Sequence, residues 1–461
     1  MPDSDDGLES DAMNVSTLRR SRLGRRALLG GVVMAGAAAA GVRELLPGGE
    51  ASSAQQRGVE QSDLLVDSIG VNTHLTWRST GYLDADRVLA SLQDMGIRHV
   101  RDRIVPSGQL RAVLNRFAAE GVRVQGICGA LGDPQTMDQV MAEVKAGYRR
   151  PLEVFTAFEG INEPNNDGVP WVTETREKTA ELFSARGRAG LSSVPIVAPS
   201  LARVNDAGVE GSSTPEQADS LGDLSDLVDL GNVHVYPRQQ TPSADIDRFI
   251  AYQRSVSGKS PVVCSEAGYF TAMNYRGGAW PTPESVVSSY LPRLVLEHWI
   301  RRTRRVFLYE LLDRYDPGNS DRLSAFGLLG IPSAEPSASW REKPAYGALK
   351  NLITLLADPG RAHRPAKLDL EIEGGKELRS ARFAKRDGSH YLALWRDVSC
   401  YDAANRRSIS VAEKDVRVKL GRRCAVSVFE PTTSAEARDQ SARTRDLRLS
   451  VGHDLVIARF A

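Results

Sequence analysis

Between residues 64 and 356, short apolar runs alternate with longer segments in which apolar residues recur every three or four positions. Short buried runs are typical of parallel strands, and the longer segments are typical of the helices that connect them. Eight runs have the length of a strand: Ser68–His74, His99–Ile104, Val122–Cys128, Ala157–Asn162, Pro195–Pro199, Asn232–Tyr236, Val262–Glu266 and Arg305–Tyr309. Eight strands, each followed by a helix, in about 290 residues predict a (β/α)8 barrel.

Residues that favour helix ends stand at the boundaries of the intervening segments. Asp84 can cap the first turn of one amphipathic segment, and Gly96 follows that segment where a helix would stop. An open, doubly wound sheet is the main alternative, because it alternates strands and helices in the same way. Such a sheet carries a Gly-rich phosphate turn after its first strand, and no G-x-G-x-x-G follows His74. The pattern therefore favours a closed barrel at residues 55–358.

The hydrophobic pattern changes after Leu356. Apolar and polar residues alternate there with period two, which is typical of antiparallel strands with one buried face. The alternating segments are Leu368–Ile372, Leu378–Phe383, Tyr391–Trp395, Val416–Leu420, Ala425–Phe429, Leu447–Val451 and Leu455–Phe460. They are separated by turn residues, and they predict a small antiparallel β-sandwich at residues 366–461. The segment Pro359–Pro365 is the expected linker.

The first 54 residues are expected to direct export rather than to fold. Arg25 and Arg26 precede Ala27–Val42, a weakly apolar run that is rich in Ala and Gly. Paired arginines before such a run are typical of the twin-arginine export signal. The run is shorter than the roughly 20 residues that a membrane-spanning helix needs, so a signal is favoured over a permanent anchor. The sequence predicts a secreted or cell-envelope protein that meets the twin-arginine translocase during export.

Composition narrows the range of partners. The chain has 461 residues, with 59 Lys and Arg against 58 Asp and Glu, and its formal net charge is +1. That balance gives no electrostatic reason to bind nucleic acid, whereas a neutral polymer such as a polysaccharide fits. The four cysteines show no Cys-x-x-Cys spacing for zinc. Cys128 and Cys264 are expected to be buried thiols, and Cys400 and Cys424 can form a bridge in an oxidising compartment.

Two glutamates stand where strands of the barrel would end. Glu163 follows the fourth predicted strand, and Glu266 ends the seventh. The C-terminal ends of all barrel strands meet at one face, so residues far apart in the sequence can lie together there. A glycosidase that retains configuration needs two carboxyl groups about 5 to 5.5 Å apart, one as nucleophile and one as acid/base. The two glutamates predict such a pair.

The segment Asn162-Glu163-Pro164 after a fourth strand, with Glu266 at the end of a seventh, resembles the clan A glycoside hydrolases. These are retaining enzymes built on a (β/α)8 barrel. A barrel of this kind followed by a β-sandwich is similar to family 39 and to several relatives of family 5. The resemblance spans the barrel, and it implies that Glu163 is the acid/base and Glu266 the nucleophile.

The same resemblance implies roles for the residues around the pair. Asn162 would hydrogen-bond to the 2-hydroxyl of the substrate. His234 and Tyr236, at the end of the sixth strand, resemble the residues that flank the nucleophile, with the tyrosine hydroxyl donating to it. Arg101 or Arg103 on the second strand resembles the arginine whose charge keeps the nucleophile ionised.

Other residues at the mouth of the barrel are candidates for binding a sugar. Asn72 and His74 end the first strand and can line the sugar site, although a histidine held by structural hydrogen bonds is an equally good interpretation. Indole rings in the loops can stack on sugar rings. Trp171 is the preferred candidate, because it follows Glu163 by eight residues, and the others are Trp77 and Trp280.

The eighth strand departs from the clan pattern. Many clan members end it with a tryptophan under the innermost sugar, whereas this sequence has Tyr309, which is the candidate to bind substrate at this strand end. Glu310 and Asp313 follow it, and they can bind hydroxyl groups or pair with an arginine.

These observations favour a secreted retaining glycoside hydrolase that cleaves a β-linked polysaccharide or glycoconjugate, without a cofactor or a metal. A carbohydrate-binding cell-envelope protein that has lost turnover is the main alternative, but the presence of both carboxylates argues against it. A metal-dependent hydrolase is a weaker alternative. It would need a ligand set such as His-x-His at the strand ends, and of 7 His the sixth strand offers only His234.

Overall fold

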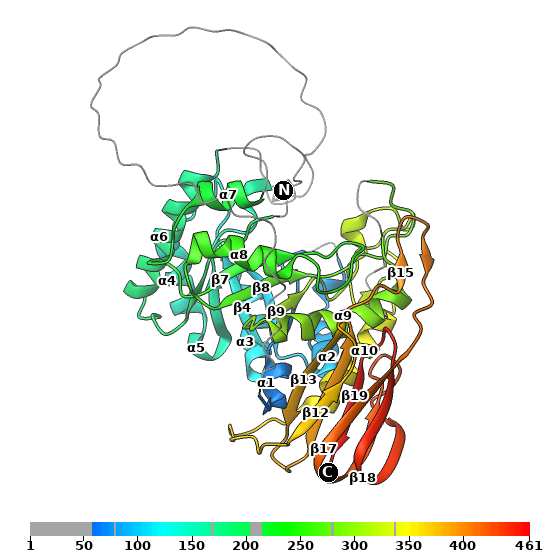
Figure 1. The fold of residues 1–461 in the computed structure, drawn as a ribbon. Coiled ribbons are helices and arrows are strands. Elements are labelled where there is room, and N and C mark those ends of the chain that lie inside the picture. The colour runs from blue at the N-terminus through cyan, green and yellow to red at the C-terminus, as the bar shows by residue number, and fades with distance from the viewer. Residues whose placement is uncertain (1–57, 78–79, 167–169, 203–213, 278–280, 336–337) are drawn as a thin grey trace, which may run out of the picture. The chain divides into compact units, whose positions relative to one another are not determined.

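Eight parallel strands form one sheet in the order β6-β5-β4-β3-β2-β9-β8-β7. Figure 1 labels β4, β9, β8 and β7 of this sheet. The computed structural model describes residues 58–77, 80–166, 170–202, 214–277, 281–335 and 338–461, so the predicted export signal lies outside the described residues. The strands are β2 (Ile69–Asn72), β3 (His99–Ile104), β4 (Arg123–Cys128), β5 (Phe155–Glu159), β6 (Ile196–Val197), β7 (Gly231–Val235), β8 (Val262–Ala267) and β9 (Val306–Leu308).

The two outermost strands of this sheet are joined by backbone hydrogen bonds. The N–H of Ala198 donates to the carbonyl of Leu230 (2.8 Å), and the N–H of Leu230 donates to the carbonyl of Ile196 (3.0 Å). These bonds bring β6 against the start of β7 and make the sheet a nearly closed barrel. The predicted (β/α)8 fold is confirmed.

Each barrel strand is followed by a helix, as expected, and a further helix, α1, precedes the first of these strands. The helices are α1 (Ser62–Asp67), α2 (Ala85–Met95), α3 (Gly108–Ala119), α4 (Met137–Gly147), α5 (Pro151–Val154), α6 (Val172–Arg188), α7 (Thr214–Leu221), α8 (Ile246–Ser257), α9 (Glu284–Ile300) and α10 (Pro344–Leu356). Asp84 caps α2 by accepting from the N–H of Arg87 (3.1 Å), and Gly96 ends it with a left-handed φ of 74°. Among the described residues, none of the helices has the length and apolar character that crossing a membrane requires.

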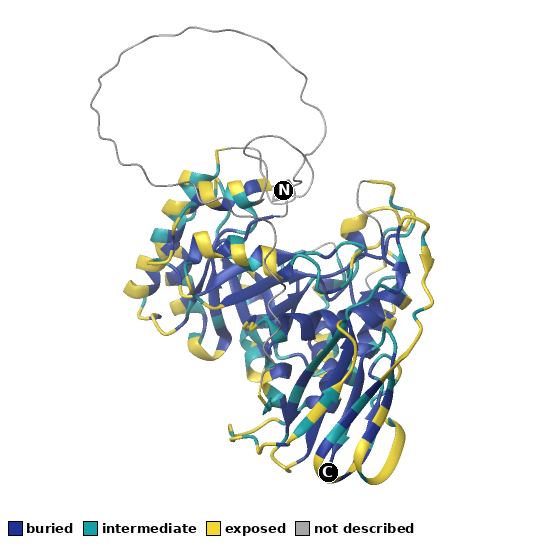
Figure 2. Cartoon of the chain, viewed as in Figure 1, coloured by how far each residue is buried: buried dark blue, intermediate teal, exposed yellow. Residues whose placement is uncertain are grey.

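The inside of the barrel changes from apolar to polar along the strands. Five buried apolar residues form a cluster inside it: Ala157, Val197, Leu230, Val263 and Phe307. Side chains two residues apart lie on the same face of a strand. The next inward positions on β5, β7 and β8 are therefore Glu159, Asn232 and Ser265, and all three are buried. The strands of the barrel as a whole are mostly buried (Figure 2). A polar layer lies above the apolar one, at the C-terminal ends of the strands, where barrels carry their functional sites.

The C-terminal strands form a second, antiparallel sheet in the order β1-β13-β14-β19-β17-β12, with β18 beside β17 (Figure 1). They are β12 (Leu370–Glu373), β13 (Leu378–Ala384), β14 (His390–Arg396), β17 (Lys414–Phe429), β18 (Ala437–Val451) and β19 (Val456–Phe460). The first strand of the chain, β1 (Glu60–Gln61), joins this sheet parallel to β13. Two short hairpins complete the strands: β10 (Leu329–Gly330) with β11 (Arg341–Glu342), and β15 (Tyr401–Asp402) with β16 (Arg407–Ser408).

Two predicted strands, Val416–Leu420 and Ala425–Phe429, are parts of the single long strand β17. The residues between them form an irregularity, because the register against β18 shifts between Lys419 and Cys424. The pairing with β18 continues on both sides, so the intervening residues bulge rather than turn. The two halves of β17 contribute to one apolar cluster, which is the core of the predicted sandwich region.

The other face of the C-terminal sheet packs against the barrel. Phe383 on β13 contacts Trp299 on α9, with ring centroids 5.9 Å apart. Trp395 on β14 is fully buried, and its indole N–H donates to Oε1 of Glu297 on α9 (2.7 Å). The sheet therefore braces the barrel through α9.

The four cysteines are buried and free. Cys400 belongs to the main apolar cluster, and Cys424 belongs to the cluster inside the C-terminal sheet. Because they point into different cores, the bridge considered for this pair is not formed.

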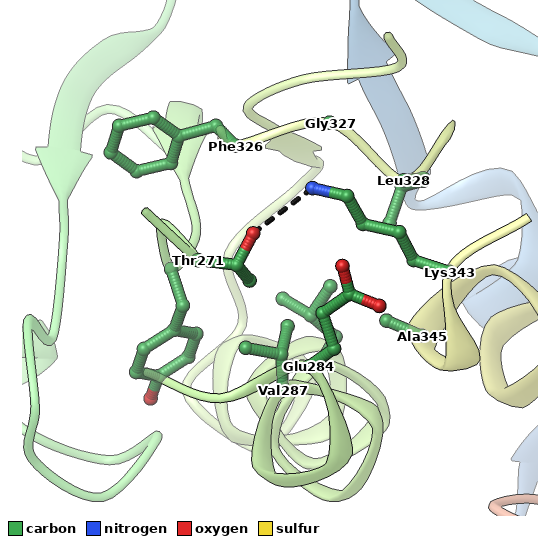
Figure 3. A pocket seen from close by; sticks show the side chains of 10 residues that line it. Thr271, Glu284, Val287, Phe326, Gly327, Leu328, Lys343 and Ala345 are labelled. Atoms are coloured by element: carbon green, nitrogen blue, oxygen red, sulfur yellow. Dashed lines mark hydrogen bonds between the residues drawn. The ribbon is translucent and has the colours of Figure 1, made fainter. Parts of the chain in front are cut away.

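Lys343 and Asp313 form a buried ion pair after the eighth barrel strand. Lys343 Nζ lies 2.7 Å from Asp313 Oδ2. It also donates to Thr271 Oγ1 at 3.1 Å, a bond that is drawn in Figure 3. Both Lys343 and Thr271 line a small pocket together with Glu284 and Phe326. Burial raises the pKa of Asp313 to about 6, although the charge of Lys343 acts in the opposite direction. Asp313 thus pairs with a lysine rather than with an arginine.

Replacing Lys343 with methionine should destabilise the protein by about 3 to 5 kcal/mol at pH 8, because the Asp313 carboxylate stays buried without its partner. The pKa of this carboxyl is already raised to about 6 and would rise further without the lysine, so it binds a proton at pH 5 and the loss should shrink there. Denaturant unfolding at pH 8 and pH 5 measures both values.

The double variant Lys343→Met, Asp313→Asn is the matched control. Asparagine keeps an oxygen that can accept from the N–H of Gly327, as Asp313 Oδ1 does at 2.7 Å, but carries no charge. It should recover most of the lost stability. A loss that is equal at the two pH values, or that persists in the double variant, would contradict an ion-pair origin.

Candidate active site

Glu163 and Glu266 lie together at the C-terminal end of the barrel. A carboxylate oxygen of each and Nδ1 of His234 all lie within 4.8 Å of one another. His234 Nδ1 is 2.7 Å from Glu163 Oε1 and 3.5 Å from Glu266 Oε2. The structure therefore brings together the two carboxylates that the sequence paired, although β5 and β8 are separated in the barrel by β6 and β7.

Glu163 follows β5 by four residues, where the chain leaves the barrel. Its backbone has a left-handed φ of 44°, and its N–H donates to Ser200 Oγ (3.2 Å). A short 3-10 helix, Pro164–Asn166, begins at the next residue, and Asn166 Nδ2 donates to Glu163 Oε2 (2.8 Å). The side chain of Glu163 is 22% exposed, against 10% for Glu266, so Glu163 is the more accessible carboxylate.

Glu266 is held by two donors, one on β3 and one directly after β7. Arg101 Nη1 donates to its Oε1 (2.7 Å), and the hydroxyl of Tyr236 donates to its Oε2 (2.5 Å). Burial alone would raise the pKa of Glu266, but the charges of His234 and Arg101 and the two hydrogen bonds outweigh burial and hold that pKa below its ordinary value. The carboxylate is therefore ionised, and the two donors fix its orientation, which are the conditions that a nucleophile requires.

Arg101 connects Glu266 to a third carboxylate, Glu159. Its Nε and Nη2 donate to the two oxygens of Glu159 (2.8 and 2.7 Å), and it also reaches Asn72 Oδ1 (2.9 Å) and Asn162 Oδ1 (2.6 Å). Both Arg101 and Glu159 are buried. The two carboxylates raise the pKa of Arg101 and the arginine lowers the pKa of Glu159, in each case against the effect of burial. The buried positive charge is thus compensated on both sides.

His234 bridges the two paired carboxylates and is completely buried. Its Nδ1 faces Glu163, and its Nε2 lies 2.9 Å from Ser265 Oγ. Burial lowers the pKa of His234, but the negative charge of Glu266 and the hydrogen bond and charge of Glu163 raise it above its ordinary value. The imidazole therefore stands between the two carboxylates as a proton-binding group.

Three other predicted residues take different positions around this core. Arg103 is exposed and lies two residues beyond Arg101 on β3, so Arg101 is the arginine that contacts Glu266. Asn72 is buried, and its amide donates to the carbonyl of Ser265 (3.0 Å) while its oxygen accepts from Arg101. It supports the arginine rather than lining the open side of the site. Asn162, which is half-buried, adjoins Glu163.

His74 and Tyr309 form an aromatic wall beside the site. The ring of His74 stacks on Trp77 with centroids 3.6 Å apart, and it meets the ring of Tyr309 edge-on at 5.6 Å. Tyr309 in turn contacts the ring of Tyr236 (6.3 Å). His74 Nε2 is 3.2 Å from a carboxylate oxygen of Glu310, which also accepts from Tyr82. Within the described residues, Glu310 therefore pairs with a histidine and a tyrosine, and no arginine forms an ion pair with it.

Trp171 stands at the start of α6 and packs, partly buried, against the main apolar cluster. None of the described contacts joins it to either carboxylate, so its predicted role in stacking on a sugar stays a prediction. Trp280 lies outside the described residues.

Four polar residues of the site were missed by sequence reasoning. Glu159, Gln125, Asn232 and Ser265 surround Arg101 and His234, and Gln125 and Asn232 donate to Glu159 at 2.7 and 2.9 Å. The sequence holds only part of the signal. A charged or polar residue inside a short apolar run must be paired if it faces the barrel interior, but the sequence does not show which way it faces.

Glu163, His234 and Glu266 also offer three atoms that could ligate a metal ion. Arg101 already places a positive charge 2.7 Å from Glu266, and the raised pKa of His234 favours the protonated ring, which cannot act as a ligand. The chemistry of these residues fits proton transfer better than it fits a bound cation. The expectation that the site uses no metal stays a prediction.

No family model matches the sequence, and no curated protein does. Solved structures do match. A family 39 glycoside hydrolase from the gut symbiont Bacteroides cellulosilyticus WH2 covers 87% of this chain and 82% of its own, with a TM-score of 0.57 and 15% identity. A glucosidase from Croceicoccus marinus covers 88% and 97% (TM-score 0.56, 12% identity), and a family 39 enzyme from Xanthomonas axonopodis pv. citri covers 87% and 95% (0.54, 12%). The chain therefore has the fold of the family 39 glycoside hydrolase structures, a barrel followed by an antiparallel sheet region, which is the fold that the resemblance of its sequence implied.

Proposed function

We propose that the protein is a retaining glycoside hydrolase in which Glu266 is the nucleophile and Glu163 the acid/base. The separation of the two carboxylates carries this proposal. Their nearest oxygens lie within 4.8 Å, which agrees with the spacing of about 5 to 5.5 Å in retaining enzymes. It is shorter than the separation of about 6.5 to 9.5 Å between the carboxyl groups of inverting enzymes, which hold a water for attack.

In the first step, the Glu266 carboxylate attacks the anomeric carbon while the Glu163 carboxyl protonates the glycosidic oxygen. The bond from the sugar to that oxygen breaks, and the aglycone leaves as an alcohol. The hydroxyl of Tyr236 and the guanidinium of Arg101 hold Glu266 ionised and oriented for this attack.

In the second step, the Glu163 carboxylate takes a proton from a water molecule, and the oxygen of that water attacks the same carbon. The ester bond to Glu266 breaks, the sugar leaves with its original configuration, and both glutamates return to their starting states. Glu163 must change protonation state twice in each cycle, and its greater exposure gives water access to it.

The proposed substrate is a β-linked polysaccharide or glycoconjugate outside the cell. The glycosidase names of the structural relatives support a sugar substrate, and the near-zero net charge supports a neutral polymer over nucleic acid. The paired arginines near the N-terminus support export by the twin-arginine route to a secreted or cell-envelope location.

A covalent trap tests the proposal. The purified protein is incubated with a panel of activated 2-deoxy-2-fluoro-β-glycosides and screened in parallel on aryl β-glycosides and bacterial exopolysaccharides, with Glu266→Gln as the matched variant. At least one fluoro sugar should add its mass to the peptide that contains Glu266, and activity should vanish in the variant. An adduct on a different residue, or an equally active variant, would refute the assignment. Tight polysaccharide binding with no adduct would favour a non-catalytic sugar-binding protein.

Glu163→Ala should show a loss of activity that depends on the leaving group. A general acid contributes about 10²- to 10⁴-fold to the rate, and that contribution disappears when the leaving group needs no proton. We expect a loss of this size on alkyl or sugar aglycones, and a much smaller loss of first-step rate on dinitrophenyl glycosides. Kinetics of kcat/KM across leaving groups measure the difference, and Glu174→Ala, an acidic residue in the first turn of α6, is the control. A uniform loss across all leaving groups would exclude Glu163 as the acid.

A further inference from the structure

A chain of hydrogen bonds runs beneath the two carboxylates from Glu159 through Ser265 to His234. Ser265 Oγ donates to Glu159 Oε1 (3.3 Å) and lies 2.9 Å from His234 Nε2. The other ring nitrogen, Nδ1, lies 2.7 Å from Glu163 Oε1. All the groups below Glu163 are buried. The chain therefore ends on the carboxyl group that acts as acid/base in the proposed function, on which this inference rests.

The direction of this chain is set at its lower end. Four N–H groups, two from Arg101 and one each from Gln125 and Asn232, already donate to the oxygens of Glu159. A carboxylate that receives so many donors is ionised and can only accept. The Ser265 hydroxyl must therefore point its hydrogen at Glu159, because the opposite orientation would place two lone pairs against each other.

With its hydrogen directed downward, Ser265 can only accept from the histidine. Nε2 of His234 therefore carries a hydrogen, which determines what Nδ1 can do. Two heteroatoms 2.7 Å apart need one proton between them, so the contact between Nδ1 and Glu163 holds a proton in either form. It sits on Nδ1 when Glu163 is ionised, and it sits on Glu163 when the imidazole is neutral.

We propose that Glu159 and Ser265 are positioning residues that fix the Nε2–H form of His234, so that His234 and Glu163 share the proton that is given to the leaving group. The competing neutral tautomer would carry its hydrogen on Nδ1 and leave Glu163 as a bare carboxylate, which cannot act as an acid. Ser265 and Glu159 disfavour that inactive arrangement without touching substrate.

Several charged groups face His234 and act on the same proton. Glu163 and Glu266 favour the protonated ring, and Arg101 opposes it. A charged imidazole carries a hydrogen on both ring nitrogens and needs an acceptor for each. Ser265 supplies the acceptor for Nε2–H. Removing this acceptor should weaken binding of the shared proton by about one pH unit or more, which is the typical worth of a hydrogen bond to a charged group.

Ser265→Ala is the decisive variant, because it removes one oxygen and leaves the strand intact. The matched control is Ser257→Ala, which removes an equally buried hydroxyl on α8 that donates only to the carbonyl of Gln253 (3.1 Å). Ser265→Thr keeps the hydroxyl and should rescue the effect. If the threonine methyl prevents folding, the alanine pair still decides the outcome.

The first readout does not need a known substrate. Nitrogen-15 NMR of histidine-labelled protein reports which ring nitrogen carries hydrogen, and the His234 signals among the 7 histidines are those lost in His234→Gln. Wild type and Ser257→Ala should show hydrogen on Nε2, whereas Ser265→Ala should gain the tautomer with hydrogen on Nδ1. Hydrogen on Nδ1 alone in wild type, or unchanged His234 signals in Ser265→Ala, would overturn the proposal.

The second readout uses an aryl glycoside found by the substrate screen. In Ser265→Ala the basic limb of kcat/KM should move to lower pH, and activity on poor leaving groups should fall about tenfold or more, while activity on dinitrophenyl glycosides stays close to wild type. A lower rate with an unchanged pH profile would overturn the proposal by assigning Ser265 a merely structural role. If no glycoside is cleaved at all, the proposed function fails, and the NMR result still decides the placement of the proton.

Discussion

Glu266→Ala should lose activity by on the order of 10⁵- to 10⁶-fold, the scale observed when a hydrolase loses its covalent nucleophile. The variant should also gain a new reaction. Removal of the carboxylate leaves a space bordered by Arg101 and Tyr236, which donate to that carboxylate at 2.7 and 2.5 Å in the wild type. A small anion such as azide can occupy that space and attack an activated aryl β-glycoside from the face that Glu266 used. The product should be the α-glycosyl azide, with inverted configuration.

Rates with and without azide, together with product configuration by NMR, measure both effects. Glu153→Ala removes an exposed carboxylate on α5 and is the control, which should stay within the small range of ordinary surface changes. Retention of activity within tenfold of wild type in Glu266→Ala would remove this residue from the mechanism. Rescue by azide with retained configuration would contradict its position below the sugar.

The barrel strands could be predicted because both of their faces are covered, so each one appears in the sequence as a short continuous apolar run. All six residues of β8, for example, are buried. The C-terminal strands could be predicted from the alternation of apolar and polar residues. On β17, for example, Val416 and Val418 are buried while Arg417 between them is not. The length of β17 was not predictable. Gly421 beside two arginines is typical of a turn, and pairing with β12, β18 and β19 on both sides of this segment keeps β17 a single strand.

The paired carboxylates could be predicted because they stand at strand ends, where a barrel collects side chains from the whole sequence. Glu159 could not. A single acidic residue in an apolar run faces in or out according to a register that the sequence does not reveal, and its partners come from three other strands. The same limit applies to the choice between Arg101 and Arg103. Both point the same way by the period of a strand, and only their depth along the barrel decides which one meets Glu266.

Arg101→Met should destabilise the protein by about 3 to 5 kcal/mol at neutral pH, because it leaves Glu159 and Glu266 buried without their shared cation. In wild type the pKa values of both carboxyls lie below their ordinary values, although burial alone would raise them. Without the arginine, burial should raise the pKa of each carboxyl above its value in the unfolded chain. Folding would then favour protonation, so the variant should lose stability as pH rises through the new pKa values.

The destabilisation should therefore be small near pH 4, where both carboxyls can be neutral, and largest at pH 8. Denaturant unfolding at several pH values measures this dependence, and the acidic limb of kcat/KM should move upward by about 1 to 3 units as the nucleophile loses the charge that keeps it ionised. Arg103→Met is the matched control, because Arg103 is exposed on the same strand and should change stability by only about 0.5 kcal/mol or less. Equal effects of the two substitutions, or an Arg101→Met protein as stable as wild type at pH 8, would show that the buried guanidinium does not hold the two carboxylates in their ionised state.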